Sequence, residues 1–417
     1  MKDPQSRRDF LRRGAGLAAT TLLWPERLDA LTTDLGRTEP GTREYWEVVR
    51  SAFLIPEDRL YLNVGTLGPQ PRAVVDAVLE HTRRVAMTYP PGVDWDALKS
   101  RVGGFINAEP AGLVFPRNTT EAMSFVANGI DFRPGDEILT TNHEHIGGLC
   151  CWQVAAARHG LTLRQLPLPV PGADADEIVG VFRRAITPRT RVISVSHVTF
   201  TTGAILPVRE IAAVCREHGI ISVVDGAHPP GMMRVDVLDI GADFYASSPH
   251  KWLLAPQGSG LLYIAAGPWR DTIWPSVASG GWDDRTLGAH RLNHMGTMDE
   301  SRLAGLDAAL RFQQAIGIDR VSDRVRALRR MLVDRLAGLP RVRIVSPRDA
   351  TRGAGMVSFE ADGMDGLALQ QRLAERANVR TRVIGEYGYG WMRLSPHIYN
   401  LEPEIERVVE LIAEALA

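Results

Sequence analysis

Short runs of β-branched and other apolar residues alternate with helical patterns along the middle of the chain, from about residue 112. Strand-like "GLVF", "DEILTT" and "RVISVSHV" precede the helical segments "TTEAMSFVANGI", "GGLCCWQVAAARHG" and "PVREIAAVCREHG", and the runs "IISVVD" and "ADFYAS" follow. This alternation predicts an α/β fold, with a mainly parallel sheet that helices cover on both faces. Ligands of such sheets bind at the carboxyl ends of the strands.

A second region begins with "ESRLAGLDAALRFQQAIG" and "VSDRVRALRRMLVDRLAGL", in which apolar positions recur at helical spacing. The strand candidates "VRIV" and "GMVSFE" follow, and then further helix to the end of the chain, which predicts a smaller α+β domain. We expect four segments: a terminal segment 1–31, a segment 32–65 that packs with the small domain, a large domain 66–295 and a small domain 296–417.

The composition is that of an ordinary globular protein, with 417 residues, 45% of them hydrophobic and 23% charged. A formal net charge of -1 gives no basic field for nucleic acid, so a nucleic-acid partner is not expected. Three cysteines make no disulfide framework, and no Cys/His spacing indicates a metal site. Cys150 and Cys151 fall in an apolar helical run, where buried structural thiols are expected.

The N-terminal stretch "SRRDFLRRGAGLAATTLLW" places Arg7 and Arg8 before a short apolar run from Gly14 to Trp24. It resembles a twin-arginine (Tat) export signal and is too short for a stable membrane span. The resemblance implies a partner, the Tat translocation machinery, and an exported, periplasmic protein. The alternative is a basic N-terminal tail on a cytoplasmic protein.

Lysine is rare in this chain, which has it at three positions, Lys2, Lys99 and Lys251, and otherwise uses arginine. An amine can lose its proton and form a Schiff base with a carbonyl, whereas a guanidinium does neither. Lys251 lies in "SSPHKWLLAPQGSG", soon after the predicted strand "ADFYAS", and Asp225 closes the strand "IISVVD" 26 residues earlier. A lysine Schiff base and a carboxylate beside a ring nitrogen are what pyridoxal 5'-phosphate (PLP) requires.

The segments "DGAHPPGM" and "SPHKWLLAPQGSGLLY" resemble those of the class V aminotransferase family of fold-type I PLP enzymes, in its isopenicillin N epimerase-like branch. The resemblance extends from "YLNVGTLGPQPRAV" to "RLSPHIYN". It implies that Lys251 bonds the cofactor and that Asp225 pairs with the pyridine nitrogen. The other implied cofactor contacts are His145 stacked on the ring as a third catalytic residue, His228 near the phenolic oxygen, and Thr119, Thr120, Ser248 and His250 at the phosphate.

The same resemblance assigns substrate contacts and a partner chain. Arg393 in "WMRLSPHIYN" resembles the arginine that binds the substrate carboxylate, and Asn63 in "YLNVGT" resembles an active-site asparagine. "MGTM" resembles the segment by which a second subunit reaches the phosphate, which implies a homodimer with Thr297 acting in trans. His143, Tyr387 and Tyr389 are weaker candidates, since glycine-spaced aromatic residues often only pack a loop.

The motifs predict a cofactor and leave the reaction open. Epimerisation, transamination and β-elimination all begin at the α carbon of an amino acid, with the freed lysine as general base. The main hypothesis is an isopenicillin N epimerase-like enzyme acting on an amino acid or an amino-acid-containing metabolite. The alternative is a carbon-sulfur lyase or aminotransferase, including one that tailors siderophore peptides.

Three other classes fit the sequence less well. A cysteine desulfurase is disfavoured because "RTRVIGEYGYGWMR" holds no cysteine before the substrate arginine. A nicotinamide-binding enzyme lacks a G-x-G-x-x-G motif after a strand. A non-catalytic binding module would have lost the lysine, the aspartate or the phosphate contacts, and all of these are present.

Overall fold

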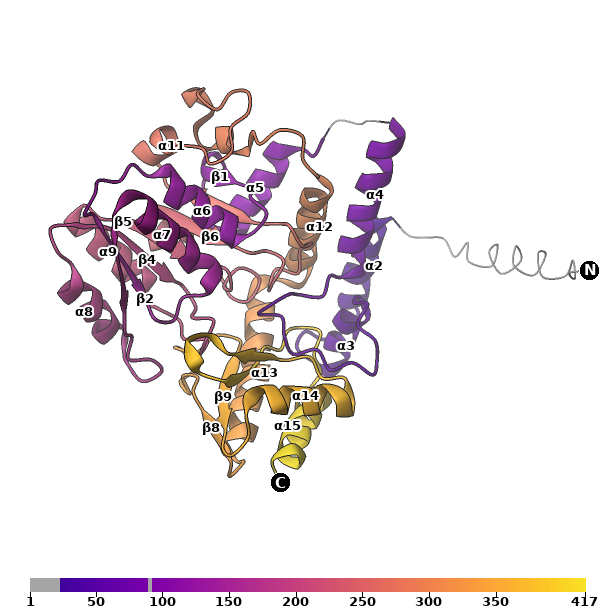
Figure 1. The fold of residues 1–417 in the computed structure, drawn as a ribbon. Coiled ribbons are helices and arrows are strands. Elements are labelled where there is room, and N and C mark those ends of the chain that lie inside the picture. The colour runs from indigo at the N-terminus through magenta and orange to yellow at the C-terminus, as the bar shows by residue number, and fades with distance from the viewer. Residues whose placement is uncertain (1–22, 89–91) are drawn as a thin grey trace, which may run out of the picture.

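The computed structural model describes residues 23–88 and 92–417. Its large domain is built on a seven-stranded sheet of order β1-β7-β6-β5-β4-β2-β3 (Figure 1). Strands β3, β2, β4, β5 and β6 pair in parallel, and β7 runs antiparallel to both of its neighbours. The strands are β1 (Leu113–Val114), β2 (Glu137–Thr141), β3 (Thr162–Leu166), β4 (Thr190–Ser196), β5 (Ile221–Asp225), β6 (Phe244–Ser247) and β7 (Leu261–Ile264).

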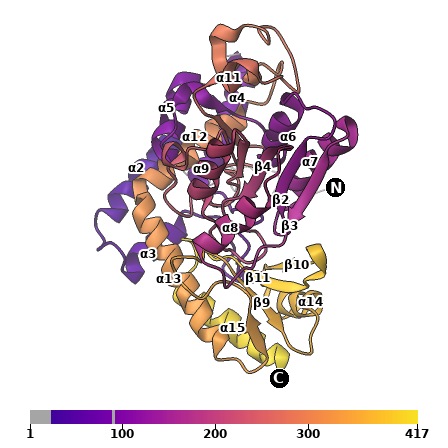
Figure 2. The same cartoon turned by 90° about the vertical axis from the view of Figure 1, so that its left-hand side faces the viewer.

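Helices cover both faces of this sheet, as the alternating pattern predicted. On one face lie α6 (Thr119–Gly129) and α7 (Ile146–His159), which share an apolar cluster with alternate sheet residues such as Ile138 and Val223. The short helix α11 (Pro268–Thr272) packs against the same cluster through Trp269. The opposite face carries other helices, most of them labelled in Figure 2. These are α4 (Arg72–Thr88), α5 (Trp95–Ile106), α8 (Ala175–Ala185), α9 (Val208–His218), α10 (Val237–Ile240) and α12 (Ser301–Ile316).

Strands β2, β5 and β6 are buried on both faces, which fits the apolar residues that stand next to one another in them. The edge strand β3, "TLRQL", is largely exposed and polar, so hydrophobic pattern did not predict it. β7 directly follows the loop 248–260, which contains Lys251. It joins the sheet only through antiparallel pairing.

The small domain has a four-stranded antiparallel sheet of order β10-β11-β9-β8. Its strands are β8 (Val342–Ile344), β9 (Val357–Ala361), β10 (Arg382–Ile384) and β11 (Trp391–Leu394). Three helices pack on it: α13 (Ile318–Ala337), α14 (Gly366–Ala377) and α15 (Glu402–Leu416). Helix α12, in the segment expected to start the small domain, instead packs along α4 in the large domain (Figure 1).

The N-terminal part of the described chain joins the two domains. Helices α2 (Trp24–Leu35) and α3 (Arg43–Ser51) share an apolar cluster with α12 and α13. Further on, backbone Leu62 bonds to Arg380 and Ser395 of the small domain. The chain then turns into the large domain.

The Tat-like motif, with Arg7 and Arg8, falls on residues 1–22 and lies outside the described residues. The last part of the expected terminal segment, residues 24–31, forms most of helix α2 and buries Leu28 and Leu31. The folded part of the chain therefore begins before residue 32.

Two features are absent from residues 23–88 and 92–417. No helix there combines the length and the apolar character needed to cross a bilayer. The same residues contain no cluster of three or more His, Cys, Asp or Glu side chains placed to hold a metal ion.

Candidate active site

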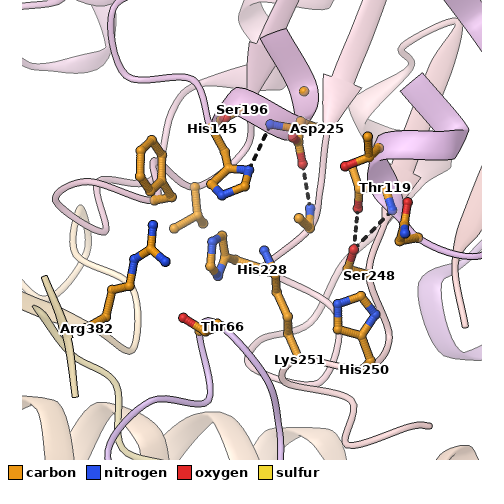
Figure 3. Close-up of a pocket in the computed structure, with 18 of the residues that line it drawn as sticks. Thr66, Thr119, His145, Ser196, Asp225, His228, Ser248, His250, Lys251 and Arg382 are labelled. Carbon is orange, nitrogen blue, oxygen red and sulfur yellow. Dashed lines mark hydrogen bonds between the residues drawn. The ribbon is translucent and has the colours of Figure 1, made fainter. Parts of the chain in front are cut away.

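A cavity of about 210 Å³ lies at the carboxyl ends of the parallel strands, where the large domain, the small domain and the turn after Asn63 meet. The large domain contributes most of its lining, including Ser196 and Asp225 from the ends of β4 and β5. The small domain contributes Arg382 and Arg393, and the N-terminal turn contributes Thr66 (Figure 3). This is the edge of the sheet at which the sequence placed its candidate residues.

Lys251 lies in the middle of the cavity, on the loop that follows β6 (Figure 3). Burial lowers the pKa of its amine to about 8, against the attraction of Asp225, and the charges of Arg393 and Arg382 lower it further. A near-neutral amine is the form that attacks a carbonyl. The loop is held from outside by Gly68, whose N–H donates to the carbonyl oxygen of His250 over 2.8 Å.

Asp225 ends β5 and is almost fully buried. Its Oδ1 accepts a hydrogen bond of 2.9 Å from the N–H of Ala227, which fixes the carboxylate plane. Burial raises the pKa of this carboxyl group, while Lys251 and the Ala227 N–H lower it. A Cβ atom added to Gly148 would lie 2.7 Å from Oδ2 of Asp225, so a glycine leaves this oxygen its space.

Two histidines flank the lysine and the aspartate. His145 precedes α7, and its Nδ1 accepts a bond of 3.1 Å from the N–H of Gly147. Nδ1 of His228 accepts from Nε1 of Trp252 over 3.0 Å. Burial, with the nearby charge of Lys251, lowers the pKa of His145 to about 3 and that of His228 well below its usual value, so both rings are neutral.

The remaining end of the cavity is formed by the start of α6 and the loop before Lys251. The hydroxyl of Ser248 accepts a bond of 3.1 Å from the N–H of Thr119 and lies 2.8 Å from the Thr119 hydroxyl. Thr120 and His250 also line this end. Free N–H groups at a helix start, together with hydroxyl donors, suit a phosphate.

Arg393 occupies the opposite end and is 2% exposed. It donates to the carbonyl oxygen of Phe200 over 2.8 Å and to the hydroxyl of Thr66 over 3.3 Å. Among the described residues it forms no ion pair, and its Nε has no hydrogen-bond partner. Burial and the charge of Arg382 lower its pKa to about 9. An unpaired buried guanidinium in a cavity is suited to a carboxylate ligand.

Two predicted residues lie outside this cavity. Asn63 is buried one step behind it, where its Oδ1 accepts a bond of 2.9 Å from Thr66, so it positions a lining residue. Thr297 is exposed on a loop and does not line the cavity of its own chain, and its expected action in trans stays a prediction.

The weaker candidates His143, Tyr387 and Tyr389 form contacts between the large and the small domain. The hydroxyl of Tyr387 donates to the backbone oxygen of Glu144 over 2.7 Å. The ring of His143 stacks on Tyr389 at 5.9 Å between centroids, and Tyr389 stacks on Trp391 at 3.9 Å. These residues position the 385–390 turn of the small domain over the large domain.

Several residues in or under the cavity were not predicted from the sequence, and three of them are Thr66, Arg382 and Glu144. Thr66 follows Asn63 by one turn, and a search for hydroxyls beside the matched motif would have found it. Arg382 could be recognised only from the register of β10 and β11, which pairs it directly with Arg393. Glu144 is buried under the cavity, with its carboxylate bonded to Thr141 and Ser196.

The residues that line the cavity supply the groups that PLP requires. A buried amine, a fixed carboxylate with a glycine beside its second oxygen, and a helix start with hydroxyl donors occupy one cavity. The rings of His145 and His228 supply flat neutral groups beside the amine. On a mainly parallel sheet with a smaller C-terminal domain, this arrangement defines a fold-type I enzyme that uses PLP.

Comparison with known proteins gives the family. The chain belongs to the aminotransferase class-V family, which matches residues 93–408. The isopenicillin N epimerase of Streptomyces clavuligerus is 33% identical over 393 residues, covering 88% of this chain and 97% of that protein.

Two solved structures share the fold. Cysteine desulfurase from Thermococcus onnurineus matches with a TM-score of 0.78 and 25% identity, covering 91% of this chain and 98% of the other. C-DES, a cystine C–S lyase seen with glycine covalently linked to its PLP, matches with a TM-score of 0.78 and 27% identity, covering 88% and 99%. The cofactor of this protein is PLP.

Proposed function

We propose that this enzyme changes the configuration of an amino acid, or of an amino-acid-containing metabolite, at its α carbon. The observation that carries the proposal is the placement of Lys251 and Arg393 in one cavity, a buried amine of lowered pKa near a buried guanidinium without an ion pair. When bound, PLP supplies an electron sink that weakens the α C–H bond of an attached amino acid. The similarity to isopenicillin N epimerase favours epimerisation among the possible outcomes.

The side chains of the cavity divide this work between them. Asp225 provides the negative charge that keeps a ring nitrogen protonated. Arg393 holds the substrate carboxylate and so orients the α carbon. Lys251, once its amine is free, takes up or returns a proton at Nζ, because a pKa of about 8 lets it hold either state near neutral pH.

Persulfide chemistry has little support in the described structure. Its cysteines, Cys150, Cys151 and Cys215, do not line the cavity. Burial raises the pKa of the Cys151 and Cys215 thiols to about 12, so neither is a thiolate at neutral pH. The turn 385–390 between β10 and β11 contains no cysteine.

The test of the function is the fate of the α hydrogen and of the amino group. Holoenzyme is incubated in deuterated water with L- and D-amino acids and followed by proton NMR and chiral chromatography. Deuterium at the α carbon together with the opposite enantiomer supports epimerisation. Conversion to an oxo acid without enantiomer exchange overturns it, and no spectral response of the cofactor to any amino acid favours a non-catalytic module.

A second candidate is a carbon-sulfur lyase, favoured by the similarity in fold to C-DES. In that case cystine or a cysteine conjugate would give pyruvate and ammonia in the same incubation. An aminotransferase would instead leave the cofactor in its amine form, which absorbs at a different wavelength. The three products separate the three reactions.

We also propose a homodimer in which Thr297 of each chain reaches the phosphate end of the other. The exposed position of Thr297 on its loop supports this proposal. Light scattering on the purified protein measures the mass, and Thr297→Ala should weaken PLP binding without changing the mass. A monomer with full PLP affinity would contradict the proposal.

The proposed location is the periplasm, reached through the Tat pathway. The support is the sequence "SRRDFLRR" alone. Residues 1–35 fused to a reporter should direct it out of the cytoplasm, and Arg7→Lys with Arg8→Lys should retain it there. Equal retention of both fusions would indicate a cytoplasmic enzyme.

A further inference from the structure

Two arginines face one another in the cavity. The antiparallel register of β10 and β11 pairs Arg382 directly with Arg393. Like charges directly opposite on neighbouring strands destabilise a sheet. Both guanidinium groups line the same cavity, and Arg382 helps to lower the pKa of Arg393. The fold therefore places two like charges side by side in the cavity.

The charges of the cavity are not balanced by its own lining. Lys251, Arg382 and Arg393 are its basic side chains, and Asp225 is the carboxylate among the described residues that line it. A cofactor phosphate would not neutralise Arg382 and Arg393, because the residues suited to bind it lie on the other side of Lys251 from Arg382. Figure 3 shows Arg382 on one side of Lys251 and Thr119, Ser248 and His250 on the other.

A single substrate carboxylate uses one arginine. Arg393 is the deeply buried one, held by Phe200 and Thr66, and it suits the carboxylate next to the reacting carbon. Arg382 lies nearer to solvent, with 31% of its side chain exposed. A group bound to Arg382 therefore belongs to a more distant part of the substrate.

Arg382 is partly neutralised by a carboxylate of its own hairpin. Its Nη2 bonds Oε1 of Glu386, in the short helix η3 (Glu386–Gly388). The other oxygen of Glu386, Oε2, is buried and has no hydrogen-bond partner in the described part of the chain. Arg382 and Glu386 thus share a single hydrogen bond, whereas a guanidinium can bind a carboxylate through two parallel hydrogen bonds. A substrate anion can therefore bind the remaining N–H groups of Arg382.

The hairpin that carries Glu386 is fixed over the cavity. Tyr387 has a left-handed backbone, with φ 60°, and its hydroxyl bonds the large-domain oxygen of Glu144 over 2.7 Å. A non-glycine residue in this conformation costs about 1 kcal/mol or more. The small-domain turn thus keeps Glu386 beside Arg382 in the absence of substrate.

We propose that Arg382 binds a second anionic group on the substrate, so that the enzyme acts on amino acids with a distal carboxylate or comparable anion. The inference rests on the proposed function, since it names the substrate class of that same site. Glu386 is the carboxylate with which such a group would compete for Arg382.

The experiment compares isosteric amino acids that differ in the distal charge. Holoenzyme is titrated with L-glutamate and L-glutamine, and with L-aspartate and L-asparagine, and the cofactor absorption gives an apparent Kd for each. We expect the acid of at least one pair to bind about tenfold more tightly than its amide, as one charge-assisted bond allows. Arg382→Gln should abolish this preference, by raising the Kd of the acid more than that of the amide.

Two further variants complete the design. Arg380→Gln makes the same chemical change at an exposed residue outside the cavity, and the preference should persist in it. Glu386→Gln removes the competing charge, and it should lower the Kd of the acid more than that of the amide. This variant keeps the test informative if Arg382→Gln does not fold.

The possible outcomes separate the two proposals. If no amino acid changes the absorption, the proposed function fails, and the substrate class fails with it. If acids and amides bind the wild-type enzyme equally, or if Arg382→Gln keeps the preference, the role of Arg382 is overturned while the proposed function stands. A preference that is lost in Arg382→Gln and kept in Arg380→Gln supports the second anion site.

Discussion

Gly148 stands against Asp225, so close that a Cβ atom at position 148 would lie 2.7 Å from Oδ2 of the carboxylate. Gly148 is in the first turn of α7, and Asp225 ends β5. A helix on one face of the sheet therefore determines the space left for the Asp225 carboxylate.

Gly148→Ala should weaken PLP binding by about tenfold or more, because the methyl group would push the Asp225 carboxylate out of its position in the cavity. The measurement is the apparent Kd for PLP, from absorption or fluorescence titration of the apoenzyme. Gly104→Ala is the control: Gly104 lies in the helix α5, and an added Cβ there meets nothing within 4 Å. It should bind PLP normally and unfold at the same or a higher temperature. Equal PLP affinity of the two variants would contradict the proposed crowding.

Lys251→Ala should remove the covalent attachment of the cofactor. In the wild-type enzyme, borohydride reduction should fix PLP on the tryptic peptide that contains Lys251, and mass spectrometry should find none on Lys99. Lys99 is buried too, but its Nζ bonds Nδ1 of His290 over 2.8 Å and does not line the cavity. The variant should retain PLP only weakly, without a reducible link. A reduced adduct on Lys99, or an unchanged adduct in the variant, would make the assignment wrong.

Glu144 predicts an unusual dependence of stability on pH. Burial raises the pKa of its carboxyl group to about 7, in spite of bonds from Ser196 and Thr141, and Asp225 raises it further. The folded protein thus binds this proton more tightly than the unfolded chain, whose pKa is near 4.5. Stability from this group is present below about pH 4.5 and is lost as the pH rises to about 7.

Glu144→Gln should remove this loss, since glutamine resembles the protonated acid. Between pH 5 and 8 the wild-type free energy of unfolding should fall relative to that of the variant, by up to about 3 kcal/mol. Chemical denaturation of both apoproteins across this range measures the difference. Glu375→Gln, at an exposed residue of α14, should run parallel to wild type at every pH. A difference between wild type and Glu144→Gln that does not change with pH would exclude the predicted titration.

Much of this architecture could be predicted because local pattern and tertiary structure agree. The buried strands β4, β5 and β6 are short and rich in apolar residues, Asp225 is the last residue of β5, and Lys251 lies soon after β6. The edge strand β3 is polar on most positions, so its place in the sheet comes from pairing with β2, which no local pattern records. Arg382 resembles any surface arginine until the register of two strands places it opposite Arg393. Sequence motifs therefore predicted most of the residues that the structure brings together in the cavity, and the structure was needed to place Arg382 among them.

The start of the folded protein gives the last prediction. Helix α2 buries Leu28 and Leu31 in the cluster shared with α12, and Arg27 forms an ion pair with Asp76 of α4. A deletion of residues 1–31 removes these contacts, and each buried leucine contributes about 2 kcal/mol or more.

The protein without residues 1–31 should therefore unfold at a temperature lower by about 5 °C or more, or should fail to fold. A deletion of residues 1–22 removes none of the described contacts and is the matched control. Thermal unfolding of the PLP-loaded proteins, followed by circular dichroism, gives the comparison. If the two deletions unfold at the same temperature, α2 contributes nothing to stability. A large difference would place the start of the folded enzyme within residues 23–31, and an export signal would then have to end before α2.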